Sequence, residues 1–212
     1  KRQVHHAPSP PGAWGKIEHY RHLLGTLLPA WLQADSPPPA WVYQLVIHRL
    51  IQVTDADRGL RFPSARLTVA ERAEVAQLLR SVTRHVPAAQ IEAYCSTPLA
   101  VGRRTALTAL AAGPMPAPIL PSARRFRSDQ KATYFFTGAL PAEQWKVDGS
   151  WASPTSAKTV DHRYFDEVVL HERIVWLPKG QITAVIDGQE LPVAPYPGNP
   201  RPPETPPGRG RP

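Results

Sequence analysis

The chain has 212 residues, a length that fits one domain or two small ones, and 42% of them are hydrophobic, which suffices for a globular core. The formal net charge of +8 comes from a shortage of acidic residues, since 25 Lys and Arg stand against 17 Asp and Glu and dense basic runs are few. The single cysteine, Cys95, excludes an intrachain disulfide, and no apolar run approaches the roughly 18 residues that cross a bilayer. We therefore expect neither a disulfide-stabilised scaffold nor a transmembrane helix.

Proline is concentrated toward the two ends of the chain, which holds 26 prolines in total. Residues 1–13 and 194–212 are expected to form an extended N-terminal arm and an extended C-terminal tail around an ordered body. The last residues, from Pro192 on, carry almost nothing to bury. We expect such ends to gain a defined shape from contacts with other molecules.

Helical patterns fill residues 14–113. The first helix is predicted from Trp14 to just before Pro29, with Trp31 in the linker that follows. A second, central helix is predicted to begin at Ser36-Pro37, with the serine as N-cap, and to run to about Thr54.

Three further helices are predicted in the same half. Thr68 and Glu71 form a capping box that opens a helix stopped by Pro87. A short helix is expected over Ala88–Cys95, and Thr97-Pro98 is expected to open a last one that ends at Gly113.

Beyond a linker over residues 114–130, the pattern changes to that of strands over 131–193. Tyr134–Phe136 and Val168–Leu177 have the composition of strands, and Asp187-Gly188 is typical of a tight hairpin turn. Together with Gln181–Val193, these segments predict a small antiparallel meander. The fold class is therefore α+β: about four to five helices arranged as antiparallel hairpins, then a β-rich segment.

Two groups of histidines are candidate metal ligands. His19 and His22 share a helix face, but the adjacent Glu18 lies about 100° around the helix, so no zinc-protease pattern arises. The densest cluster of potential ligands lies in a predicted strand region, where neighbours alternate faces, so a charged strand edge is favoured over a metal site. This cluster consists of Asp161, His162, Asp166, Glu167, His171 and Glu172.

Tryptophan and arginine supply the candidate contacts with partners. Two of the six tryptophans lie in a polar, loop-like stretch, where such side chains are favoured anchors at protein interfaces. Arginines in proline-rich segments suit pairing with carboxylates of neighbouring proteins, and they could also contact RNA phosphates or anionic lipid. The candidate partner-binding residues are Trp145, Trp151, Arg124, Arg125, Arg127, Arg201, Arg209 and Arg211.

No nucleotide-binding, hydrolase or zinc-protease motif occurs in the chain. We predict a non-catalytic accessory subunit, without cofactor or metal, that binds other protein subunits of a large mitochondrial energy-transducing complex, such as the ATP synthase or a respiratory chain complex. The first residue, Lys1, and the basic balance indicate a removed transit peptide and a place in the matrix or peripheral to the inner membrane.

Two alternatives stay open. A mitochondrial ribosomal protein would contact rRNA through the arginine-rich arms. An enzyme could instead form its site only in three dimensions, gathering His162, Asp166 or His171 in a closed pocket.

Overall fold

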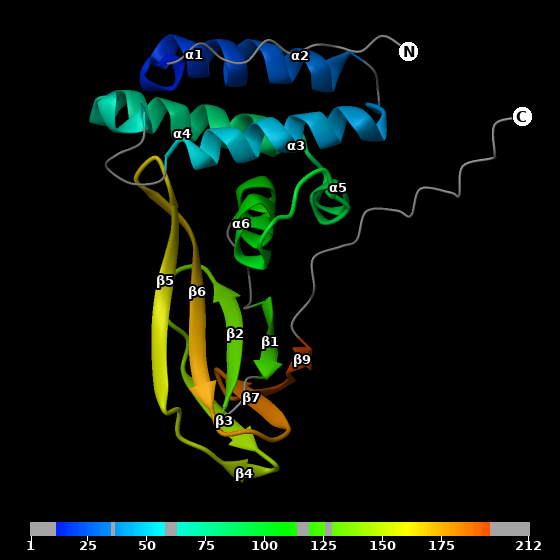
Figure 1. Cartoon of the computed structure of the whole chain (residues 1–212), viewed down its shortest axis with the longest axis vertical. Coiled ribbons are helices and arrows are strands. Elements are labelled where there is room, and N and C mark those ends of the chain that lie inside the picture. The colour runs from blue at the N-terminus through cyan, green and yellow to red at the C-terminus, as the bar shows by residue number, and fades with distance from the viewer. Residues whose placement is uncertain (1–11, 35–36, 58–62, 114–118, 126–128, 196–212) are drawn as a thin grey trace, which may run out of the picture. The chain divides into compact units, whose positions relative to one another are not determined.

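The computed structural model describes residues 12–34, 37–57, 63–113, 119–125 and 129–195, the side chains of 119–125 and 195 excepted. The chain divides into two compact units. The first unit ends at Val86 and also includes Tyr164–Glu167. The second unit contains Pro87–Arg163 and the chain from Val168 on. Helices dominate the N-terminal half, and sheets that are antiparallel except for the β1–β9 pair follow (Figure 1), which confirms the predicted α+β class. None of the described helices combines the length and apolarity needed to cross a bilayer.

The first unit is a bundle of helices. Its α1 packs on α4 and its α2 on α3, around buried side chains such as Tyr20, Leu28 and Ile47. Its elements are η1 (Ala13–Gly15), α1 (Ile17–His22), the π-helical η2 (Leu23–Leu27), α2 (Leu28–Gln33), α3 (Ala40–Asp55), η3 (Pro63–Arg66) and α4 (Val69–Thr83).

The capping-box prediction is confirmed at the start of α4. The Thr68 hydroxyl accepts a hydrogen bond from the Glu71 backbone N–H, and the Glu71 carboxylate accepts one of 2.7 Å from the Thr68 N–H. The hydrogen bonds to Thr68 hold the pKa of the Glu71 carboxyl below its usual range.

Two predicted helix boundaries in this unit are wrong. The first helix does not end before Pro29, because a π-helical turn precedes this proline and accommodates a residue without N–H. In that turn the Leu28 N–H donates to the Leu23 carbonyl. Trp31 therefore lies in α2 and not in a linker. The central helix begins at Ala40 and not at Ser36-Pro37, since a residue that precedes proline is disfavoured in a helix and prolines run to Pro39.

The turn between β5 and β6 belongs to the first unit. Phe165 and Asp166 both adopt left-handed backbone angles, with φ of 50° and 68°. The Phe165 ring is 1% exposed and lies edge-on to Tyr20 at 5.5 Å between centroids. Its backbone N–H donates to the Asp57 carboxylate, and Asp166 accepts two hydrogen bonds from the Arg72 guanidinium at 2.6 and 2.9 Å.

The second unit is a β-sandwich with two helices. Its five-stranded sheet has the order β5-β6-β2-β1-β9 and its four-stranded sheet the order β4-β3-β7-β8. Even-numbered residues of β2, such as Tyr134, pack with Trp145 and Ile182 in the core between the sheets. The strands are β1 (Ile119–Arg125), β2 (Gln130–Phe136), β3 (Glu143–Val147), β4 (Ser150–Trp151), β5 (Ser156–Tyr164), β6 (Glu167–Leu177), β7 (Ile182–Ile186), β8 (Gln189–Pro192) and β9 (Ala194–Pro195).

The helices of this unit, α5 (Ala88–Glu92) and α6 (Val101–Ala112), pack against each other. The buried Arg104 guanidinium of α6 donates to the carbonyls of Ile91 and Glu92 at 2.7 and 2.6 Å, where α5 ends. Gly102 brings α6 close to β5, because a Cβ there would lie 2.7 Å from the His162 ring.

Several predictions for this half need correction. The linker over 114–130 is wrong for 119–125, which form β1; a register irregularity between Ile119 and Ser122 accommodates Pro121, which has no N–H. The strands after residue 131 do not form one meander, since β6 and β7 lie in different sheets. The last helix begins at Val101 rather than at Thr97-Pro98, because the N-cap residue Ala100 has non-helical backbone angles, with ψ of 145°, and Leu99 ahead of it is buried. The strands predicted from Tyr134 and Val168 and the turn at Asp187-Gly188 are confirmed.

The predicted tail over 194–212 begins with β9, and residues 196–212 lie outside the described part of the chain. The same holds for residues 1–11 of the predicted N-terminal arm.

Candidate functional site

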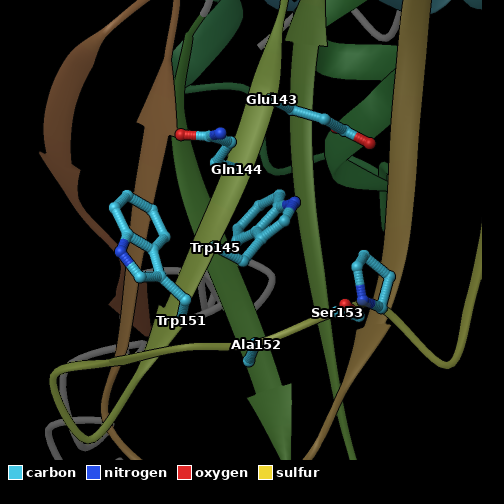
Figure 2. Close-up of a pocket in the computed structure, with 7 residues that line it drawn as sticks. Glu143, Gln144, Trp145, Trp151, Ala152 and Ser153 are labelled. Atoms are coloured by element: carbon cyan, nitrogen blue, oxygen red, sulfur yellow. The ribbon is translucent and has the colours of Figure 1, made fainter.

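An open pocket of about 370 Å³ lies at one edge of the sandwich, where the chain leaves the four-stranded sheet for the five-stranded one. Its volume is in the range of sites that bind small molecules or single side chains. Figure 2 shows β3 with side chains on both sides of it and the segment after Trp151 below. The lining residues are Glu143, Gln144, Trp145, Trp151, Ala152, Ser153 and Pro154.

A tight hairpin places the exposed wall of this pocket. Asp148 and Gly149, with φ of 50° and 79°, form the two-residue turn between β3 and β4, and this turn sets Trp151 directly opposite Lys146. The Trp151 side chain is 63% exposed, and the Lys146 ammonium lies 4.7 Å from its ring centroid. Lys146 also pairs with Glu190 of β8. The cation and its partner thus fix one face of an otherwise exposed indole.

The one carboxylate in the pocket lining is fully engaged. One Glu143 oxygen accepts a hydrogen bond of 2.8 Å from the Tyr134 hydroxyl, and the other accepts one of 2.9 Å from Arg173 Nε. Burial, and then the hydrogen bond to Glu143, raise the pKa of Tyr134 far above its usual range. The hydrogen bond to Glu143 likewise raises the pKa of Arg173. The pocket therefore carries a neutralised ion pair and offers no free carboxylate.

Trp145 forms the inner wall. It is 2% exposed and lies 6.3 Å from Tyr134 between ring centroids. Its indole N–H is buried, and no acceptor for it occurs among the described residues. In Figure 2 this indole and that of Trp151 lie on different sides of β3, so the pocket presents aromatic surface from both faces of the sheet edge.

Binding through apolar and aromatic contact is the chemistry that this lining suits best. Its polar side chains are the engaged Glu143, the exposed Gln144 amide and the Ser153 hydroxyl. General acid–base catalysis needs a titratable group within reach of a reacting atom. Glu143 is the one titratable side chain in the lining, and both of its carboxylate oxygens already accept hydrogen bonds.

The two tryptophans singled out from sequence both line this pocket. The expectation that they lie in a loop is wrong, because Trp145 is the centre of β3 and Trp151 ends β4. Sequence reasoning missed Glu143 and Gln144. The Asp148-Gly149 pair was the available signal, since it carries the same hairpin signature that was recognised at Asp187-Gly188.

None of the candidate arginines is among the residues that line the pocket. Arg124 and Arg125 lie in β1, and their side chains are outside the described part of the structure. The remaining four, Arg127, Arg201, Arg209 and Arg211, are outside it altogether.

The cluster of acids and histidines from 161 to 172 separates into pairs. His162 lies 3.0 Å from Glu172, and His171 lies 2.9 Å from Asp161. Hydrogen bonds from Arg163 and then His171 hold the pKa of Asp161 below its usual range. Asp166 and Glu167 instead pair with Arg72 and Arg80 in the first unit. No group of three or more potential metal ligands occurs within the described ranges.

Of the two helical histidines, His19 lies among aromatic side chains. His19 packs edge-on against Trp14 at 4.5 Å between centroids. Burial, His22 and Arg49 together lower the pKa of His19.

Comparison with protein-family models, with curated proteins and with solved structures gives no match for this chain.

Proposed function

We propose that the protein is a non-catalytic structural subunit that binds another protein of a larger assembly through the edge pocket of its sandwich. The observation that carries the proposal is the Trp151 indole, 63% exposed and braced by Lys146 over an open pocket. A large apolar side chain is stabilised when a partner removes it from water, and tryptophan is the residue type most enriched among the energetic anchors of protein interfaces.

The charge of the pocket favours a protein partner over a nucleic acid. Glu143 is neutralised by Arg173, and Lys146 is paired with Glu190. Binding to a phosphate backbone draws its affinity from cations that replace counterions, and the lining residues contain no Lys or Arg. The alternative of a ribosomal protein therefore gains nothing from this surface.

The mitochondrial location, and membership of the ATP synthase or a respiratory chain complex, are part of this proposal and rest on the sequence alone. Fractionation of the cells that express the chain naturally, followed by co-migration of the chain with an inner-membrane complex on a native gel, tests that part. Absence of the chain from the mitochondrial fraction contradicts the location and leaves the binding pocket untouched.

The first prediction concerns the pocket itself. Replacing Trp151 by alanine in the full chain is expected to lower recovery of its protein partner by about 30-fold, the effect of losing one interface anchor. The measurement is quantitative mass spectrometry of proteins that co-purify with the tagged chain from the cells that express it naturally, with chemical crosslinks mapped to residues 143–154.

Trp41→Ala is the matched control, because Trp41 is 64% exposed on α3 of the other unit. It is expected to leave recovery unchanged. Equal recovery with both variants contradicts the proposal. Co-purification of rRNA as the sole partner favours the ribosomal alternative, and substrate turnover by the purified chain contradicts the non-catalytic role.

A further inference from the structure

The backbone N–H and C=O groups of β3 point alternately toward β7, where they are paired, and toward the opposite edge of the strand, where the pairing is incomplete. The Asp187 N–H donates to the Ala142 carbonyl and the Asp148 N–H to the Gln181 carbonyl, so even-numbered residues of this strand face β7. Odd-numbered residues therefore turn their N–H and C=O groups the other way. The Ala152 N–H donates to the Trp145 carbonyl at 2.9 Å on that other side.

The partner strand on this side stops too early to cover all of β3. β4 ends at Trp151, and its pairing with β3 extends over Lys146 and Val147 only. Continued in the same register, the residue opposite Glu143 would be Pro154, which has no N–H to donate. The chain instead crosses to the other sheet, where the Thr155 N–H donates to the Trp176 carbonyl.

Glu143 therefore directs its backbone N–H and C=O into the pocket. No hydrogen bond from another strand meets these two groups in the described part of the chain. An unpaired stretch of strand edge is a template for one more strand. Here the template is flanked by the aromatic walls of Trp145 and Trp151 and lies in a pocket whose single carboxylate is already paired.

We propose that the pocket takes an uncharged, extended segment of the partner protein, which adds to the edge of β3 by exchanging two hydrogen bonds with the backbone of Glu143. The proposal rests on the protein-binding function above and specifies the chemistry of its ligand. Alternation along the segment sends one side chain toward Trp145 and Pro154 and its neighbours toward Gln144 and Trp151. The neutral lining disfavours a charged residue at the position opposite Glu143.

The test uses a library of random seven-residue peptides, displayed on phage and selected on the full chain, with Trp151→Ala as the counter-selection target. The probe is the most enriched peptide, made synthetically. Its binding is expected to slow hydrogen exchange at the Glu143 amide at least tenfold under saturation. The Gln144 amide, which faces β7, is the internal control and is expected to keep its exchange rate.

Backbone N-methylation of the probe gives a second readout. Methylating the residue that pairs with Glu143 is expected to weaken binding about tenfold or more, because it removes a donor and adds bulk, whereas methylating either neighbour is expected to change affinity less than twofold. A probe that binds without changing exchange at Glu143, or that tolerates every N-methyl group, overturns strand addition while the protein-binding function stands. Failure to enrich any peptide over the Trp151→Ala target overturns strand addition, and crosslinks of the native partner that avoid residues 143–154 overturn the function as well.

Discussion

Two hairpin turns of this protein have the same backbone form and opposite origins. The turn between β3 and β4 uses Asp148-Gly149, a pair that adopts positive φ readily. The turn between β5 and β6 uses Phe165-Asp166, and a bulky residue at φ of 50° is rare. In the second turn, contacts with Tyr20, Asp57 and Arg72 hold the left-handed backbone that Phe165 and Asp166 do not favour by themselves. The backbone angles of the first turn follow from its own Asp-Gly pair, to which Gln181 adds hydrogen bonds with Asp148, whereas the angles of the second turn are imposed by packing.

The largest expected effect is at the packed turn. Phe165→Ala removes a fully buried ring and leaves the left-handed backbone in place, so it is expected to lower the free energy of unfolding by about 3–4 kcal/mol. Urea unfolding followed by circular dichroism measures this. Val168→Ala, at a half-exposed position three residues on, is the control and is expected to cost under about 1 kcal/mol. Equal losses would mean that the ring does not hold the turn.

A smaller effect is expected at the local turn. Gly149 has φ of 79° with open space around it, so Gly149→Ala meets no clash and bears only the backbone penalty, about 1 kcal/mol in the free energy of unfolding. Gly188→Ala is the matched variant, since Gly188 has φ of 81° and equally open surroundings. The two losses are expected to agree within about 0.5 kcal/mol. A loss at Gly149 as large as that of Phe165→Ala would contradict a purely local origin.

The smallest expected effect is a dependence of the free energy of unfolding on pH through Asp57. Burial raises the pKa of Asp57, although hydrogen bonds from Phe165 and Ser64 and the charge of Arg72 oppose the shift. The folded protein thus holds this proton more tightly than the unfolded chain, so the stability it contributes is present below the unfolded pKa of 3.8 and is lost as pH rises through the raised folded value.

Asp57→Asn cannot lose that proton. The free energy of unfolding of this variant, relative to the wild type, is therefore expected to rise between pH 3.5 and pH 7. Asp166→Asn, at an exposed carboxylate of the same turn, serves as the reference. A constant difference between Asp57→Asn and wild type over this range would show that Asp57 does not titrate as its burial implies.

The same contrast explains what could be predicted from the sequence. The capping box at Thr68, the strand at Tyr134 and the turn at Asp187-Gly188 were predictable, because each depends on residues adjacent in the chain. Trp145 and Trp151 were found as candidate contacts by residue type alone.

Features that depend on distant partners were not predictable in this way. β1 forms in a proline-rich segment because β2 and β9 flank it, and the division of the strands into two sheets follows from core packing around residues such as Trp145. The open edge at Glu143 required the register of three strands, β4, β3 and β7, which no local pattern encodes.

The buried Arg104 has a consequence for the order in which the second unit folds. α5 has five residues, far fewer than an isolated helix needs to persist in water, and its last carbonyls are held by a guanidinium from α6. Because that side chain reaches Ile91 and Glu92 only once α6 is in place, we expect α5 to form after α6 rather than to serve as a nucleus for it.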